Sequence, residues 1–144
     1  MKMKKIMLVG RSESGKTTLT QALRGQKITY HKTQYIGFKD LVIDTPGEYA
    51  ENKDLSSALA LYSYEADVIG LLVSATEPFT LFPPNIVTMV NREVIGIVTK
   101  IDDPQANLEQ KKLWLTLSGC KDIFFVSGIT GEGLPELYNH LKKP

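Results

Sequence analysis

The chain has little cysteine, little histidine and almost no net charge. One cysteine, Cys120, excludes an internal disulfide and is typical of a protein from a reducing compartment. The formal charge is +1, from 17 basic and 16 acidic residues, so bulk charge draws the protein neither to nucleic acid nor to an anionic membrane. No apolar run reaches transmembrane length. We therefore expect a cytoplasmic protein that binds no nucleic acid and no membrane.

Short apolar segments recur along the chain, at residues 6–9, 41–43, 68–73, 94–98 and 123–126. Near-continuous runs of this kind predict strands that are buried on both faces of a parallel sheet. The segments between them have helical spacing, with apolar stripes at Leu55, Leu59 and Tyr62, at Leu113, Leu117 and Cys120, and at Leu134, Leu137 and Leu141. The 144 residues therefore predict one domain with a three-layer α/β/α fold. Its mostly parallel central sheet should have about six strands, with helices on both faces.

Residues 10–17, Gly-Arg-Ser-Glu-Ser-Gly-Lys-Thr, fit the phosphate-binding pattern G-x-x-x-x-G-K-[ST]. The segment follows an apolar run and precedes a helical one, so its backbone N–H groups and a helix dipole would converge on a phosphate chain. Lys16 would lie against the outer phosphates, and the Thr17 hydroxyl would ligate Mg²⁺. The predicted phosphate-binding residues are Gly10, Glu13, Ser14, Gly15, Lys16, Thr17 and Thr18. The protein is expected to bind a nucleoside phosphate.

A second motif, Asp-Thr-Pro-Gly at residues 44–47, follows the strand expected at residues 41–43. The Asp44 carboxylate can hold Mg²⁺, and the N–H of Gly47 can approach a γ-phosphate closely because glycine has no side chain. Glu48 comes next in the chain. It either orients an attacking water molecule or begins the following helix as a surface residue, and both interpretations stay open.

A third motif, Thr-Lys-Ile-Asp at residues 99–102, follows another expected strand and suits the recognition of guanine. Guanine presents two adjacent donors, N1–H and the 2-amino group, and the Asp102 carboxylate can accept from both. Adenine lacks these donors and would leave the carboxylate unpaired, which gives strong discrimination. The alkyl stem of Lys100 can cover one face of the base. Ser127 can brace Asp102, and the Gly128 N–H can point at the guanine O6. The predicted base-binding residues are Thr99, Lys100, Asp102, Ser127 and Gly128.

Together these motifs resemble those of the small-GTPase superfamily, and the Asp-Thr-Pro-Gly segment is similar to that of its bacterial Era-type branch. Lys-Thr-Gln at residues 32–34, the segment 44–49, the segment 94–100 and the short length resemble the EutP/PduV family. That family is found with the bacterial microcompartments of ethanolamine and propanediol utilisation. The resemblance implies a cytoplasmic P-loop G domain, residues 1–144, that binds GTP or GDP with Mg²⁺ and associates with an enzyme-filled protein shell.

The resemblance also implies roles for single residues. Thr33 stands where the family has its first switch threonine, although Thr29 lies nearby and is the alternative. Glu13 replaces an asparagine that holds K⁺ in some Era-type proteins, and it either binds a cation or faces solvent. The implied catalytic residues are Lys16, Thr33, Gly47 and Glu48, and the implied metal ligands are Thr17, Asp44 and Thr33. No residue identifies itself as an arginine finger, so hydrolysis should be slow.

Three functions fit these observations. The first is a GTP-binding switch, with slow Mg²⁺-dependent hydrolysis, that acts as an assembly or localisation factor for a microcompartment. The alternative is a small phosphotransferase that uses ATP or GTP to phosphorylate a short-chain carboxylate. The third is a non-hydrolysing adaptor in which Phe79, Leu81 and Phe82 dock a partner, unless these side chains pack onto their own domain. The protein should be a monomer or a weak nucleotide-dependent dimer.

Four remaining residues of rarer types are expected to be structural. His31 and His140 have no partner at the spacing of metal ligands in the sequence. Trp114 should pack in or beside the core, and Cys120 should be a small core residue at a helix end.

Overall fold

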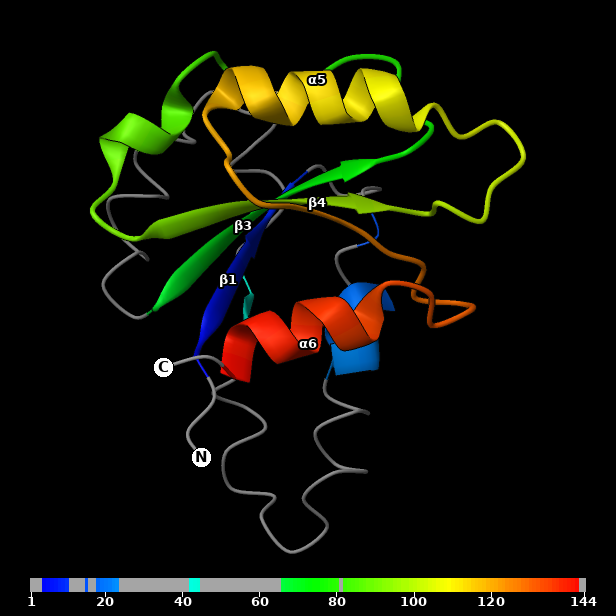
Figure 1. Cartoon of the computed structure of the whole chain (residues 1–144), viewed down its shortest axis with the longest axis horizontal. Coiled ribbons are helices and arrows are strands. Elements are labelled where there is room, and N and C mark those ends of the chain that lie inside the picture. The colour runs from blue at the N-terminus through cyan, green and yellow to red at the C-terminus, as the bar shows by residue number, and fades with distance from the viewer. Residues whose placement is uncertain are drawn as a thin grey trace, which may run out of the picture.

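The computed structural model describes residues 4–10, 15, 18–23, 42–44, 66–80 and 82–142. Within them, five parallel strands form one sheet in the order β2-β1-β3-β4-β5 (Figure 1). The strands are β1 (Ile6–Val9), β2 (Val42–Asp44), β3 (Val68–Ser74), β4 (Glu93–Thr99) and β5 (Ile123–Phe125). The apolar runs predicted each strand to within one residue at either end. The sequence predicted about six strands, of which five lie within the described residues.

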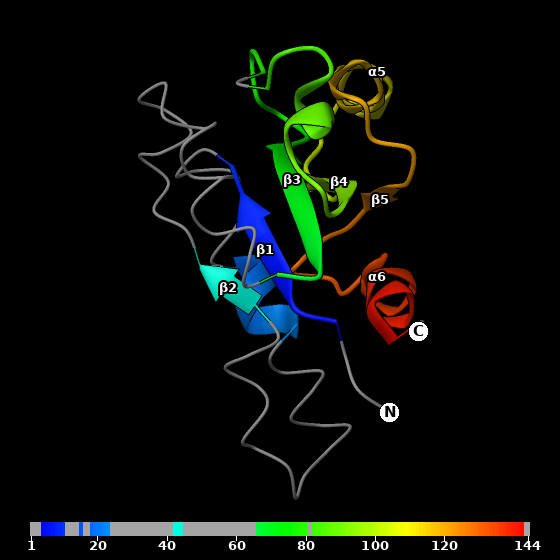
Figure 2. The ribbon, with the colours of Figure 1, turned by 90° about the vertical axis from the view of Figure 1, so that its left-hand side faces the viewer.

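Helices cover both faces of the sheet, which confirms the three-layer prediction. One face carries α5 (Leu108–Ser118) and the short 3-10 helix η3 (Ile86–Met89). The other carries α6 (Leu134–Lys142) and a helical segment at residues 18–23 (Figures 1 and 2). Within the described residues, no helix combines the length and the apolarity that crossing a bilayer requires.

Strand β1 shows why continuous apolar runs suit this sheet. Successive side chains of a strand point to opposite faces. Ile6 and Leu8 therefore join the core cluster beneath α6, whereas Met7 and Val9 join the cluster beneath α5. All of these side chains are buried, so each residue of the strand contributes to one of two cores. This arrangement requires apolar residues at every position of a central strand.

Helix α5 buries a different face from the one that the sequence predicted. Leu113 and Leu117 are 56% and 54% exposed, and the buried residues of the helix are Lys111, Leu115 and Ser118. The predicted stripe was wrong because the close approach of β4, rather than apolar content, sets the rotation of the helix. A Cβ atom at Gly96 of β4 would lie only 2.8 Å from Leu115 Cδ1.

The buried face of α5 includes Lys111, so a hydropathy pattern does not identify it as the buried face. The Lys111 side chain is almost fully buried, and its Nζ lies 4.6 Å from the centroid of the Trp114 ring and donates to Gln110 Oε1 at 2.6 Å. Desolvation by burial lowers the pKa of Lys111, and the nearby Glu77 carboxylate partly opposes that shift. Trp114 itself is half-buried beside the core, as the sequence predicted.

The packing predicted for α6 and for Cys120 is confirmed. The stripe of Leu134, Leu137 and Leu141 on α6 is buried, as predicted. Cys120 is also buried, directly after the helix-ending Gly119, and burial raises the pKa of its thiol to about 12. A thiol that stays protonated is a poor nucleophile, in agreement with a structural role. The stripe at residues 55–62 lies outside the described residues.

The apolar side chains in the loop after β3 were expected either to dock a partner or to pack onto their own domain, and they do not all behave alike. Phe82 is buried and belongs to the core cluster beneath α5. Phe79 is 52% exposed, and Leu81 lies outside the described residues. The three side chains therefore do not act as one docking surface, and Phe82 packs onto its own domain.

The corrected face of α5 can be tested with two matched truncations. Leu115→Ala leaves a cavity against β4 and should lower the free energy of unfolding by about 2–5 kcal/mol. Leu113→Ala removes the same atoms from an exposed position and should change it by less than about 0.5 kcal/mol. Urea unfolding, followed by circular dichroism, measures both values. Equal losses in the two variants would contradict the observed rotation of the helix.

Candidate functional site

A cavity of about 130 Å³ opens at the carboxyl ends of β1 and β4. Three segments of the chain line it: the start of the helix at residues 18–23, the turn after β4 and the loop after β5. The lining residues are Gly15, Thr18, Leu19, Thr99, Lys100, Asp102, Asp103, Val126, Gly128 and Ile129. Ligands of open α/β sheets bind at this edge, where the carboxyl ends of parallel strands meet. The cavity therefore joins the phosphate motif to the predicted base motif.

Gly15 is the point at which the two motifs meet. Its φ of +92° is a left-handed conformation that favours glycine. A Cβ atom at this position would lie 3.1 Å from Thr99 Oγ1 and 3.7 Å from Lys100 Cε. The alkyl stem of Lys100 thus runs alongside the glycine, and Thr99 packs against the glycine backbone. Any side chain at position 15 would push the base motif away from the phosphate loop.

The turn after β4 presents Asp102 at the rim of the cavity. Lys100 adopts a φ of 59°, and its carbonyl accepts from the N–H of Asp103 at 3.1 Å. Asp103 Oδ1 in turn accepts from the N–H of Gln105 at 2.8 Å. Both carboxylates line the cavity, but these bonds occupy Asp103 in shaping the turn, whereas Asp102 is exposed. The carboxylate of Asp102 is thus available to a ligand.

Ser127 shapes the loop after β5. Its buried Oγ accepts hydrogen bonds from the N–H groups of Ile129, at 3.2 Å, and Thr130, at 3.0 Å. The sequence predicted instead that Ser127 braces Asp102, and the structure shows no such contact. The hydroxyl faces its own loop because the turn at residues 128–130 leaves backbone N–H groups that need an acceptor.

Gly128 lies against the helix that follows the phosphate motif. A Cβ atom at this position would lie 2.5 Å from Thr18 Cγ2, closer than real Cβ contacts come. The loop after β5 can therefore sit on the helix start only if residue 128 has no side chain. This contact sets how far the two walls of the cavity stand apart.

Strand register places two more predicted residues near the same edge. Gly10 is buried and directly follows β1, and Asp44 is the last residue of β2. Asp44 pairs with Leu8, so the two strands end side by side. The remaining predicted residues lie outside the described part of the chain, and their roles stay predictions. They are Glu13, Ser14, Lys16, Thr17, Thr29, Thr33, Gly47 and Glu48.

Four residues that line the cavity were not predicted from the sequence, namely Leu19, Asp103, Val126 and Ile129. Each lies within two residues of a motif position in the chain. Leu19 and Val126 are core residues whose edges reach the cavity, and such a residue carries no signal that separates it from the rest of the core. Ile129 is an apolar side chain beside the predicted base site, and it is 81% exposed. This unusual exposure distinguishes it, but only in the structure and not in the sequence.

The model of a protein family described as ethanolamine utilisation – propanediol utilisation matches residues 3–143. The chain belongs to the PduV-EutP family. It is 44% identical over 138 residues to the propanediol utilization protein PduV of Citrobacter freundii, and the match covers 94% of this chain and 91% of that protein. It is 32% identical over 125 residues to the probable acetate kinase EutP of Escherichia coli K12, with coverage of 85% and 79%. The resemblance seen in the sequence motifs is confirmed.

Solved structures of similar shape give the fold a name. The FeoB G-domain from Methanococcus jannaschii matches 97% of this chain and 96% of its own, with a TM-score of 0.63 and 23% sequence identity. At that identity the likeness establishes the fold alone. This PduV-EutP member therefore has the G-domain fold that its motifs predicted.

The contact between Gly128 and Thr18 can be tested by a rescue experiment. Gly128→Ala should lower the free energy of unfolding by about 1–3 kcal/mol, because the new methyl group meets Thr18 Cγ2. Thr18→Ser removes that methyl group and keeps the hydroxyl, so in its background Gly128→Ala should cost much less. Chemical unfolding of the four proteins of this double-mutant cycle gives the coupling. Additive losses would mean that the loop does not rest on the helix.

Proposed function

We propose that this PduV-EutP member binds a guanine nucleotide with Mg²⁺ and hydrolyses GTP slowly. In this way it acts as a switch, or as an assembly or localisation factor, for a microcompartment of ethanolamine or propanediol utilisation. The observation that carries the proposal is the cavity in which the Thr99–Asp102 motif packs directly on Gly15 of the phosphate motif. The family match supports the metabolic setting.

The cavity suits a nucleoside. Its walls supply apolar edges from Leu19, Val126 and Ile129 for the faces of a base, and a carboxylate at one rim. Asp102 accepts from N1–H and the 2-amino group of guanine, and the stem of Lys100 covers the base on its way to Gly15. Adenine offers no donor at N1 or C2 and would leave that carboxylate without a partner.

The phosphates extend from the base toward the start of the helix at residues 18–23. The N–H of Leu19 donates to the carbonyl of Gly15 at 2.9 Å, so the helical hydrogen bonding begins at the glycine itself. The first N–H groups of a helix generally have no partner inside it and suit an anion, so we infer that the phosphates bind there. Lys16 would neutralise the outer phosphates, and Thr17, Asp44 and Thr33 are the residues proposed to hold Mg²⁺.

Hydrolysis on this site needs few groups from the protein. Water attacks the γ-phosphorus in line, the bond to the β–γ bridging oxygen breaks, and GDP and phosphate form. When bound, Mg²⁺ offsets negative charge on the phosphate oxygens. Lys16 and the Gly47 N–H would stabilise the transferring group, and Glu48 would either accept a hydrogen bond from the water or face solvent. Because no residue of the sequence identifies itself as an arginine finger, we expect turnover to be slow.

The guanine preference can be tested by inverting the hydrogen-bond pattern at residue 102. Asp102→Asn replaces one acceptor with a donor, which opposes the guanine 2-amino group. GDP affinity should fall by about 100-fold, which corresponds to about 3 kcal/mol. Xanthine carries a carbonyl in place of that amino group, so xanthosine diphosphate should bind the variant better than it binds the wild type.

Calorimetric titration with GDP, ADP and xanthosine diphosphate, in the presence of Mg²⁺, measures these affinities. Glu109→Gln is the control, because it also replaces a carboxylate with an amide, at an exposed position on α5 that does not line the cavity. Equal affinity of the wild type for GDP and ADP would refute the guanine assignment while leaving the phosphate site intact.

A second candidate function comes from the relatives named probable acetate kinase EutP, which are 31–32% identical to this chain. In such a reaction, a carboxylate oxygen of acetate attacks the γ-phosphorus of ATP or GTP. The bond to the β–γ bridging oxygen breaks, and acetyl phosphate and a nucleoside diphosphate form. The same phosphate motif would serve, and Lys16 would stabilise the transferred group.

The two functions can be separated by trapping the product. Acetyl phosphate reacts with hydroxylamine to give a coloured hydroxamate complex, whereas GTP hydrolysis releases phosphate whether or not acetate is present. A kinase should form hydroxamate in proportion to acetate, and Lys16→Ala should remove that signal. Retention of activity with ATP in Asp102→Asn would favour the kinase. Phosphate release without hydroxamate would favour the GTPase.

A further inference from the structure

Three side chains with metal-binding atoms meet at the edge of the sheet opposite the cavity. Glu93 is the first residue of β4, Asp122 directly precedes β5, and His140 lies on α6. Alternation along the strands brings them to one face: Glu93 shares its face with Ile95, and Asp122 shares its face with Phe124. Both of those side chains pack in the core cluster beneath α6, where His140 is located.

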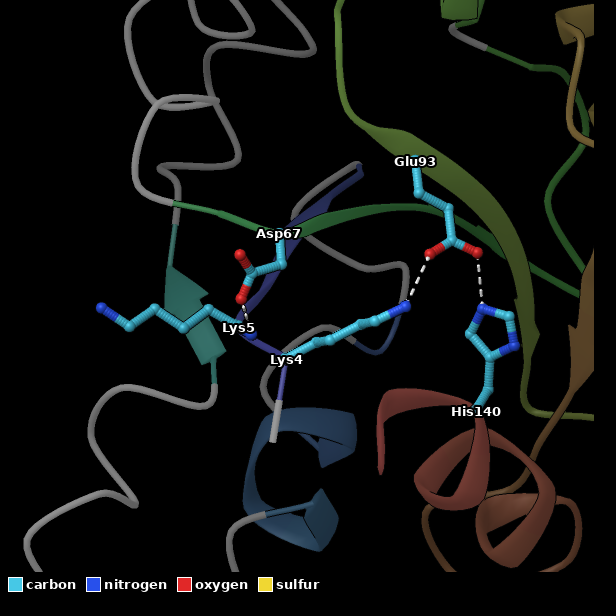
Figure 3. A network of polar contacts seen from close by, with 5 residues as sticks. All are labelled: Lys4, Lys5, Asp67, Glu93 and His140. Carbon is cyan, nitrogen blue, oxygen red and sulfur yellow. Dashed lines mark hydrogen bonds and ion pairs between the residues drawn. The ribbon is translucent and has the colours of Figure 1, made fainter. Parts of the chain in front are cut away.

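The ligand atoms are already close together. His140 Nε2 lies 2.7 Å from Glu93 Oε2, and one ligand atom from each of the three residues falls within 4.8 Å of the others. Figure 3 shows the imidazole and the Glu93 carboxylate pointing toward each other. The part of the chain that the structure describes contains no other group of three such side chains.

Packing holds the histidine ring in this orientation. His140 is only 14% exposed, and its ring meets the edge of Phe124 with centroids 5.1 Å apart and planes inclined by 60°. Glu93 is 34% exposed, and Asp122 is also exposed, so solvent and ions reach the carboxylates from one side. A partly buried imidazole with two accessible carboxylates resembles a site with three protein ligands and an open position.

We propose that Glu93, Asp122 and His140 bind a divalent transition-metal ion of the zinc class, at a site separate from the nucleotide site. One imidazole nitrogen and two carboxylate oxygens are ligands that Zn²⁺ accepts, whereas Mg²⁺ and Ca²⁺ favour oxygen alone. Ligands in a tetrahedral zinc site lie about 3.3 Å apart. Here the three ligand atoms all lie within 4.8 Å of one another. Small rotations of the two exposed carboxylates complete the geometry.

Lys4 competes with the metal ion for this site. Its Nζ lies 3.4 Å from Glu93 Oε1 (Figure 3). Its backbone N–H donates to the carbonyl of Leu141 at 2.9 Å. The backbone bond keeps Lys4 beside α6, while its side chain, at 27% exposed, can turn toward water. In the absence of metal the ammonium neutralises Glu93, and a dication would displace it by charge repulsion. Removal of the Lys4 charge should therefore strengthen metal binding.

The test is a titration of metal-stripped, untagged full-length protein with ZnCl₂ in the absence of nucleotide. One Zn²⁺ should bind per chain, and an excess of Mg²⁺ should not displace it. His140→Gln, which retains a hydrogen-bonding side chain toward Glu93, and Asp122→Asn should each weaken binding by at least about tenfold. Lys4→Met should tighten it. Glu109→Gln is the control for Asp122→Asn, because it also replaces a carboxylate with an amide, at an exposed position on α5. It should not change the affinity for Zn²⁺.

A spectroscopic readout separates this site from metal bound elsewhere on the chain. Co²⁺ in place of Zn²⁺ should give the intense visible absorption of a four-coordinate ion, and Asp122→Asn, at an exposed position, should abolish it without lowering thermal stability. Wild-type Zn²⁺ affinity in both His140→Gln and Asp122→Asn would overturn the proposal. So would the absence of Zn²⁺ binding to the wild type. Each of these results leaves the guanine-nucleotide assignment untouched, because that site lies at the other edge of the sheet.

Discussion

Parallel pairing of β1, β3 and β4 is the constraint on which the rest of this structure depends. Parallel strands cannot be joined by tight turns, so each connection must cross over one face and cover it. Both faces of the central strands are therefore shielded from water, and the carboxyl ends of all the strands lie at one edge of the sheet. The phosphate motif after β1 and the Thr99–Asp102 motif after β4 are therefore brought together by topology, although they are far apart in sequence.

Close contacts at glycines then set the fine geometry. Gly15 lets Thr99 and Lys100 touch the phosphate loop, Gly128 lets the loop after β5 rest on Thr18, and Gly96 lets Leu115 of α5 settle onto β4. At these positions a Cβ atom would lie 3.1 Å, 2.5 Å and 2.8 Å from its neighbour, closer than ordinary van der Waals contact. These contacts depend on the absence of a side chain at the glycine, so no apolar or charged residue in the sequence indicates them.

This explains which features the sequence could predict. The strands and the stripe of α6 followed from continuous or regularly spaced apolar residues, and the base motif followed from a fixed spacing. The rotation of α5 could not be predicted, because burial of Lys111 depends on Trp114 and on the approach of Gly96. The partners of Ser127 depend on the local turn. The meeting of Glu93, Asp122 and His140 depends on three elements that only the fold brings together.

The position of α6 has a consequence for the order in which this chain can fold during synthesis. Helix α6 covers Ile6 and Leu8 of β1, and the Lys4 N–H bonds to Leu141 near its end. Strand β1 is the first of the described elements in the chain and lies beside the central strand β3, whereas α6 is the last of them. Leu19 and Leu23 reach this core cluster from the segment that follows β1, but the cluster is complete only when residues 134–142 have been made. Closure of this core therefore joins residues from the two ends of the described chain, and such long-range contacts form slowly.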